Sequence, residues 1–119
     1  MTITAHSKTS GLPQETLRKV VSAIVDEVDP ELIILFGSLA RGEGHQESDL
    51  DLLVVESEDF GPAHSRCREA GRLYRRLAGL GRSKDIVLVS RNEFEHWRDS
   101  LNHVVARAWQ EGVVLHERH

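Results

Sequence analysis

A second cysteine, long apolar runs and an excess of basic side chains are all missing from this sequence, and each absence excludes a class of protein. One cysteine, Cys67, cannot form an intrachain disulfide, which is typical of a chain that works in the reducing cytoplasm. No apolar run approaches the ~18 residues that a membrane-spanning helix needs. Fifteen Lys and Arg against nineteen Asp and Glu give a net charge of −4, whereas domains that bind nucleic acid through bulk charge are usually basic. We therefore expect neither membrane insertion nor direct nucleic-acid binding.

The length and composition fit a single folded domain. Of the 119 residues, 39 % are apolar and 29 % are charged, an ordinary balance for a globular chain. A chain of this size buries roughly 60–70 % of the surface that it exposes when unfolded, which suffices for one core. Residues 1–12 are predicted to form a flexible leader, so the domain is expected to span residues 13–119.

Hydrophobic periodicity predicts helices that alternate with short strands. Between Pro13 and Val28, apolar residues recur at i, i+3, i+4, i+7 and i+8, the pattern of a helix with one buried face. A further helix begins at Ser90, whose spacing from Glu93 is that of a capping box, and could break near Ser100. The helix between them, over 63–78, is expected to bury Ala63, Cys67, Ala70, Tyr74 and Leu77.

Apolar runs of strand length separate these helices. They cover residues 32–36, 49–55 and 85–89, with a short final segment at 113–115. Alternation of this kind indicates an α/β (α+β) fold, in which about four helices flank a small sheet of three to four strands.

Acidic side chains open two of these strands. Asp49 and Asp51 are two residues apart, so on a strand they point to the same face, with α-carbons roughly 6.6 Å apart. Carboxylates that close repel each other unless a cation intervenes, and Mg²⁺ is a hard cation that takes oxygen ligands. Asp85 opens the next strand and could be a third ligand. Acidic residues at strand starts are also often merely solvated, so the pair alone leaves both interpretations open.

A glycine–serine step follows the first apolar run. Gly37-Ser38 precedes a polar segment, 39–42, that is predicted to form one or two helical turns. Glycine lets a phosphate approach the backbone, and N–H groups at the start of a helical turn attract anions. A strand-to-helix turn also needs glycine for steric reasons, so this step alone does not establish a phosphate site. Neither a P-loop nor a dinucleotide-binding motif is present.

Convergence of these residues on one site constrains the sheet. Gly37-Ser38 lies at the C-terminal end of the first strand, whereas the aspartates lie at the N-terminal ends of the second and third. They can meet only if the first strand runs opposite to the other two, with the 63–78 helix as a parallel crossover. The sheet is therefore predicted to be mixed. A doubly wound enzyme instead gathers its ligand at the C-terminal ends of its strands.

Phe36-Gly37-Ser38, a ten-residue spacer and Asp49-Leu50-Asp51-Leu52 together resemble the signature of the DNA polymerase β-like nucleotidyltransferase superfamily. The stretches 37–42 and 48–52 look like its smallest branch, the minimal nucleotidyltransferase (MNT) domain, as does the ending at 111–115. The similarity covers roughly residues 32–89. It implies a mixed sheet flanked by helices, two Mg²⁺ ions, and transfer of a nucleoside monophosphate, AMP if the donor is ATP, to an acceptor hydroxyl.

The resemblance also implies a role for each site residue. Three carboxylates would hold the metals and do the catalytic work, with the last also a candidate to take the proton of the acceptor: Asp49, Asp51 and Asp85. Four residues would contact the nucleotide, the first two through its β- and γ-phosphates: Gly37, Ser38, Arg41 and Ser48. Arg41 could equally be a structural ion-pair partner.

The acceptor does not follow from these residues. Larger members of the superfamily, such as those that adenylylate aminoglycosides, resemble this core plus an acceptor-binding domain, so here the acceptor is expected on a partner chain, on a second copy, or free. Stand-alone MNT proteins are often paired with a helical HEPN-domain RNase toxin, which they neutralise by attaching AMP to it. The resemblance therefore implies an antitoxin. The alternatives are a non-catalytic nucleotide-binding module that sequesters its partner, and a transferase that acts on an aminoglycoside-like small molecule.

The remaining conspicuous side chains are assigned to the surface or to the core. The five arginines from Arg66 to Arg76 are expected on a solvated or partner-facing helix surface. Core packing is predicted for Cys67, and core or subunit contacts for Trp97 and Trp109. The seven histidines show no ligand spacing, and His116 is placed in a terminal tail, so no zinc site is expected.

Overall fold

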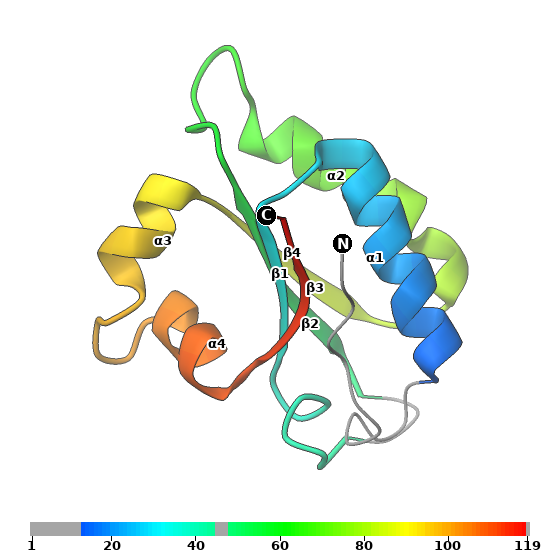
Figure 1. Ribbon diagram of the computed structural model, residues 1–119. Coiled ribbons are helices and arrows are strands. Elements are labelled where there is room, and N and C mark those ends of the chain that lie inside the picture. Colours follow the sequence, from blue (N-terminus) through cyan, green and yellow to red (C-terminus); the bar gives the residue numbers. More distant parts are fainter. Residues whose placement is uncertain (1–12, 45–47, 119) are drawn as a thin grey trace.

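A four-stranded mixed sheet forms the middle layer of the computed structural model, which describes residues 13–44 and 48–118 (Figure 1). The strand order is β3-β2-β1-β4. β1 (Leu32–Phe36) runs antiparallel to β2 (Leu50–Glu56) and β4 (Val113–Glu117), while β2 and β3 (Lys84–Ser90) are parallel. The mixed sheet is thus confirmed, and the predicted leader at 1–12 lies outside the described residues.

Two pairs of helices cover the two faces of this sheet (Figure 1). α1 (Gln14–Val28) and α2 (Arg66–Arg76) lie on one face, and α3 (Arg91–Trp97) and α4 (Val104–Glu111) lie on the other. Together with the 3₁₀ turn η1 (Ala78–Leu80), α2 connects the parallel strands β2 and β3. No helix among the described residues combines the length and the apolar character that crossing a membrane demands.

The alternation of side chains along each strand divides the core into two clusters. On the α1/α2 side the strands contribute Ile33, Leu35, Leu52, Val54, Ile86 and Leu88. On the α3/α4 side they contribute Leu32, Ile34, Leu53, Val55 and Val89. Because the period of a strand is two residues, Asp51 and Asp85 fall on the α3/α4 side, while Glu56 falls on the α1/α2 side.

The capping box at the start of α3 is confirmed. Ser90 Oγ accepts a hydrogen bond from the Glu93 N–H at 3.1 Å, and the Glu93 carboxylate accepts one from the Ser90 N–H at 2.9 Å. The break near Ser100 is also confirmed, because the chain turns there, with Asn102 at a φ of 59°, before α4 begins.

The predicted buried face of α2 is only partly right: Leu77 is buried and Ala70 packs half-buried against the core, but Ala63, Cys67 and Tyr74 are exposed. The helix begins at Arg66 rather than at residue 63, because Gly61 and His64 form a small antiparallel bridge and Ser65 caps the first turn. The buried positions are consequently Glu69, Leu73 and Leu77. Cys67 is exposed, and Tyr74 is 36 % exposed, with its hydroxyl accepting a hydrogen bond from Ile86 N–H.

Three of the five α2 arginines are held by neighbouring carboxylates. Arg66 bonds to Glu93 at 2.8 Å, Arg72 to Glu27 at 3.0 Å, and Arg76 to Asp26 and Glu27 at 3.1 Å. The charged surface of α2 is thus largely tied to α1 and α3.

Two other assignments of large side chains need correction. Trp97 and Trp109 are 38 % and 42 % exposed, so they are not core residues, and their place at a subunit contact stays a prediction. Trp97 stacks on His103, with ring centroids 4.3 Å apart. His116 is not in a tail, because β4 continues to Glu117 and buries this side chain.

Candidate active site

The end of β1 meets the start of β2 at a close contact between Gly37 and Asp51. Phe36 is the register partner of Asp51 in the antiparallel ladder, and Gly37 follows it with a φ of 78°. A Cβ atom on Gly37 would overlap Oδ2 of Asp51 and lie 3.2 Å from its Cγ. Glycine is therefore required here both for its left-handed conformation and for the space that the carboxylate occupies.

The third predicted carboxylate stands next to Asp51. Asp85 on β3 is the register partner of Asp51 across the parallel ladder, and both side chains belong to the α3/α4 side. Asp49 precedes β2 by one residue and is exposed. Burial raises the pKa of Asp51, the carboxylates of Asp85 and Asp49 raise it further, and Arg41 lowers it. Burial and the two neighbouring carboxylates together outweigh Arg41, so the pKa of Asp51 is raised.

Gly37, Asp51 and Asp85 line a cleft of about 280 Å³. Its walls come from the end of β1, from the starts of β2 and β3, and from α4. The lining residues are Phe36, Gly37, Arg41, Asp51, Asp85, Val104, Arg107 and Glu111. The structure therefore brings four of the seven predicted site residues into one cleft.

The segment after Gly37 forms a single turn, the shorter of the two lengths predicted, and does not continue as a helix. Arg41 N–H donates to the Gly37 carbonyl at 3.2 Å, and Gly42, at a φ of 76°, ends the turn. Leu39 anchors it in the core with no exposed surface. Within the described residues, the N–H groups of Ser38 and Leu39 donate no hydrogen bond to a backbone carbonyl. This turn can therefore offer backbone donors to an anion.

Arg41 forms ion pairs at the rim of the cleft. Its Nε lies 3.1 Å from Glu43 and its Nη1 lies 3.7 Å from Glu111. All three side chains are substantially exposed, so these pairs contribute little to stability. The geometry leaves both sequence interpretations of Arg41 standing, because an exposed, loosely paired guanidinium can still move to an anionic ligand.

The other predicted contacts lie beside the cleft rather than in its lining. Ser38 and Ser48 are half-buried, and the Ser48 carbonyl accepts a hydrogen bond from Arg82 at 2.7 Å. Asp49 influences the site through its charge on Asp51. The structure thus places these three near the cleft, and their roles stay predictions.

Sequence reasoning missed the α4 wall. Val104, Arg107 and Glu111 enter the cleft because α4 packs against β1 and the chain then returns as β4 beside it. Arg107 and Glu111 have ordinary i, i+4 spacing on the polar side of an amphipathic helix. Only the long-range packing of α4 distinguishes them from solvated residues.

The donor set suits a hard divalent cation. Asp51 and Asp85 offer carboxylate oxygens from adjacent, paired positions, and the charge of Asp49, just before β2, acts on Asp51. Mg²⁺ prefers oxygen ligands, and two carboxylates are a common protein contribution to its shell. The raised pKa of Asp51 fits this assignment, because a cation would relieve the repulsion that raises it.

Sequence comparison identifies the family. The sequence model described as a nucleotidyltransferase domain matches residues 16–109. The chain belongs to this family. The predicted family, the α+β fold and the assignment as a nucleotidyltransferase are thus confirmed.

Two curated relatives come from Methanocaldococcus jannaschii, and both are named provisionally as protein adenylyltransferases. MJ1379 is 37 % identical over 73 residues, which are 61 % of this chain and 73 % of that protein. MJ0604 is 39 % identical over 49 residues, which are 40 % of this chain and 49 % of that protein.

Solved structures with the same fold include two toxin–antitoxin crystal structures. One, with AMP-PNP, has a TM-score of 0.59 and 23 % identity over 87 % of this chain and 74 % of its own. The other is a mutant MntA–HpeT complex with a TM-score of 0.59, 20 % identity and the same coverage. Identities this low show a shared fold.

Proposed function

We propose that this nucleotidyltransferase is a Mg²⁺-dependent protein adenylyltransferase of the cytoplasm, which transfers AMP from ATP to a hydroxyl of a partner protein. We further propose that the partner is a HEPN RNase toxin and that the chain acts as its antitoxin. The observation that carries the catalytic part is the contact of Gly37 with Asp51, with Asp85 paired beside it.

The arrangement supports an in-line displacement. The acceptor oxygen bonds to the α-phosphorus while the bond to the oxygen that bridges the α- and β-phosphates breaks, and pyrophosphate leaves. The hydroxyl proton passes to a carboxylate, and the exposed Asp85 is our candidate. Mg²⁺ held by Asp49, Asp51 and Asp85 would neutralise charge on the attacking and leaving oxygens. The chain itself positions the triphosphate through the turn at Gly37-Ser38.

The relatives support the choice of acceptor. Two of them carry the name protein adenylyltransferase, and two solved neighbours are toxin–antitoxin structures, one with an ATP analogue. The mutant MntA–HpeT complex carries two aspartate-to-glutamate changes two positions apart, the same spacing as Asp49 and Asp51. Because the cleft is small and open, a hydroxyl on the surface of a partner protein could reach it.

Mass spectrometry tests this proposal. The chain is incubated with the product of its neighbouring gene, ATP and Mg²⁺. We expect the mass of that product to rise by one or more AMP groups, and we expect no rise with Asp51→Asn. A binding module that merely sequesters its partner would give no mass change, and Asp51→Asn would then protect cells as well as wild type does.

Arg107 is expected to contribute to nucleotide binding. It lines the cleft and forms no ion pair with a carboxylate in the described part of the chain, so its guanidinium is available to a triphosphate. Arg107→Ala should weaken Mg²⁺–ATP binding about tenfold, or about 1.4 kcal/mol, since a solvent-screened contact is worth less than a buried one. Calorimetric titration measures this. Arg68→Ala, on α2, is the matched control and should bind ATP as wild type does; equal affinity for Arg107→Ala would remove Arg107 from the site.

A further inference from the structure

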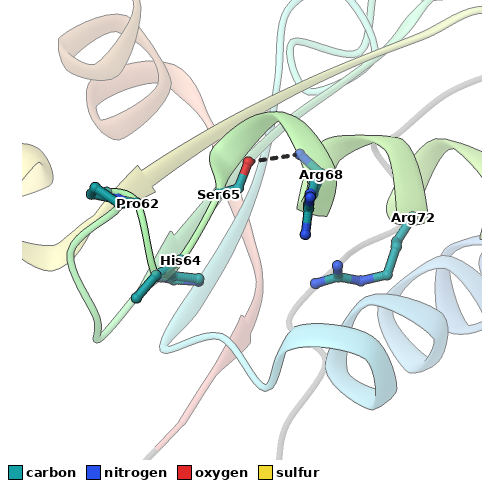
Figure 2. Close-up of a pocket in the computed structure, with 7 residues that line it drawn as sticks. Pro62, His64, Ser65, Arg68 and Arg72 are labelled. Atoms are coloured by element: carbon teal, nitrogen blue, oxygen red, sulfur yellow. Dashed lines mark hydrogen bonds between the residues drawn. The ribbon is translucent and has the colours of Figure 1, made fainter.

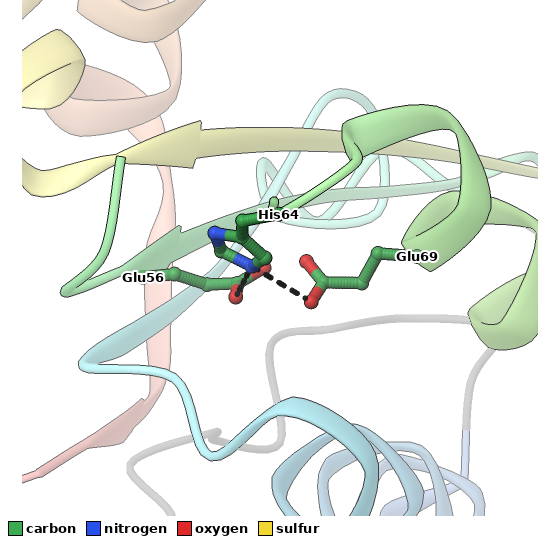
Figure 3. Close-up of side chains that lie close together, drawn as sticks. All are labelled: Glu56, His64 and Glu69. Atoms are coloured by element: carbon green, nitrogen blue, oxygen red, sulfur yellow. Dashed lines mark hydrogen bonds and ion pairs between the residues drawn. The ribbon is translucent and has the colours of Figure 1, made fainter. Parts of the chain in front are cut away.

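A second cluster of ionisable side chains lies at the opposite end of β2 and on the opposite face of the sheet. It consists of Glu56 at the end of β2, His64 in the loop that follows, and Glu69 in the first turn of α2 (Figure 3). Nε2 of His64 lies 3.4 Å from Oε1 of Glu56 and 3.2 Å from Oε1 of Glu69. Glu56 lies five steps along the strand from Asp51, or roughly 17 Å. The cluster therefore belongs to a different site.

The two carboxylates in this cluster are buried without enough partners. Glu56 and Glu69 are each only 4 % exposed, and Oε2 of each has no hydrogen-bond donor among the described residues. Arg72 lies 3.8 Å from Oε1 of Glu69, but it also bonds to Glu27 at 3.0 Å. Burying a carboxylate without enough partners costs free energy unless a cation or a proton compensates its negative charge.

The orientation of His64 directs Nε2, with its lone pair or its proton, at the carboxylates of Glu56 and Glu69. Its Nδ1 lies 3.0 Å from the carbonyl oxygen of Asp59, to which it must donate. The ring also stacks on Phe60, with centroids 4.5 Å apart, so its plane is fixed. Histidines that bind metals characteristically donate their second ring N–H to a carbonyl or carboxylate in this way. Nε2 is thereby presented to both glutamates.

We propose that Glu56, His64 and Glu69 form a binding site for a divalent transition-metal ion, of which Zn²⁺ is the best fit. Three atoms, one from each residue, lie within 4.8 Å of one another. A tetrahedral Zn²⁺ with bonds of about 2.0–2.1 Å places its ligand atoms about 3.3–3.4 Å apart, close to the two distances from Nε2. One imidazole and two carboxylates leave a fourth position for water.

Protons could balance the charge of this cluster in place of a metal ion. In the metal-free chain, burial and hydrogen bonding to Glu69 raise the pKa of Glu56 to about 9, and the Asp59 carbonyl, ahead of the Glu69 carboxylate, raises the pKa of His64. One proton between the carboxyls and one on His64 would balance the charge. A single divalent cation supplies the same two positive charges and would compensate the charge of both buried carboxylates, whose Oε2 atoms have no partner among the described residues.

The cluster borders a cleft through His64. A cleft of about 480 Å³ is lined by the loop 61–65 and by Arg68 and Arg72 of α2, and His64 forms part of its wall (Figure 2). Bound metal would tie the end of β2, this loop and α2 together. Because α2 leads to β3 and hence to Asp85, the site would stabilise the crossover on which the catalytic cleft depends.

Calorimetric titration of Zn²⁺ into the metal-stripped full chain tests the proposal. The chain carries Asp51→Asn and Cys67→Ser, which remove the catalytic carboxylate and the exposed thiol as alternative sites. We expect one Zn²⁺ per chain. Glu56→Gln and His64→Asn should each weaken binding by at least the roughly 10–100-fold that loss of an outer-shell partner costs. Co²⁺ bound in place of Zn²⁺ should give the intense visible absorption of a four-coordinate site.

His96→Asn is the matched control, because His96 is an exposed histidine outside the cluster, and it should bind Zn²⁺ as the parent does. Zn²⁺ should also raise the thermal midpoint of the parent but not of His64→Asn. His64 lies on a half-exposed loop, so His64→Asn should keep the fold even if Glu56→Gln does not; circular dichroism verifies this. Absence of binding, or equal binding by parent and ligand variants, would overturn the proposal and leave a proton-sharing cluster.

Discussion

Asp51→Asn is expected to reduce nucleotidyl transfer by on the order of 10³-fold or more, while the free energy of unfolding without Mg²⁺ does not fall. The loss arises because a neutral amide cannot replace a carboxylate that neutralises metal charge. Stability is preserved because Asp51 is half-buried beside Asp85 and Asp49, which raise its pKa. Removing its charge removes repulsion that the folded state suffers and the unfolded state does not.

Single-turnover transfer assays and chemical denaturation measure the two halves of this prediction. Asp99→Asn is the control, because Asp99 is an exposed aspartate in the turn between α3 and α4. It should change neither quantity. Substantial transfer by Asp51→Asn would remove Asp51 from the catalytic centre, and a marked loss of stability would show that its carboxylate is structural instead.

The placement of the main strands could be predicted because each signal is local. The run 32–36 is apolar at every position, and β1 covers those same residues. The convergence of Gly37 with Asp51 and Asp85 could then be predicted, because Gly37 follows the C-terminal end of its strand whereas the aspartates lie near the N-terminal ends of theirs. The antiparallel register of Phe36 with Asp51 meets that requirement.

Features that depend on long-range contacts escaped prediction. The buried face of α2 was partly misjudged because the bridge between Gly61 and His64 delays the helix, and periodicity alone cannot detect a late start. Arg107 enters the cleft only because α4 packs on β1. The cluster at Glu56 joins a strand, a loop and a helix, so no fixed ligand spacing along the sequence marks it.

Gly37→Ala should disable the proposed catalytic cleft at a modest cost in stability. At a φ of 78°, alanine pays the left-handed penalty of about 1–2 kcal/mol, partly offset by the reduced freedom of the unfolded chain. Its Cβ would also overlap Oδ2 of Asp51 and displace that carboxylate. Since a shift of about 1 Å in a catalytic group can cost about 10²-fold, we expect at least that loss of transfer.

Gly81→Ala separates the two effects, because Gly81 has a φ of 63° and no atom within 4 Å of an added Cβ. Both variants should lose about 1 kcal/mol of unfolding free energy in denaturant titrations, since both force alanine into the left-handed region. Only Gly37→Ala should lose transfer activity. If the two variants lost activity equally, backbone strain would explain the defect, and the contact between Gly37 and Asp51 would have no catalytic meaning. If only Gly37→Ala lost transfer activity, the space left by Gly37 would be what fixes the position of the Asp51 carboxylate.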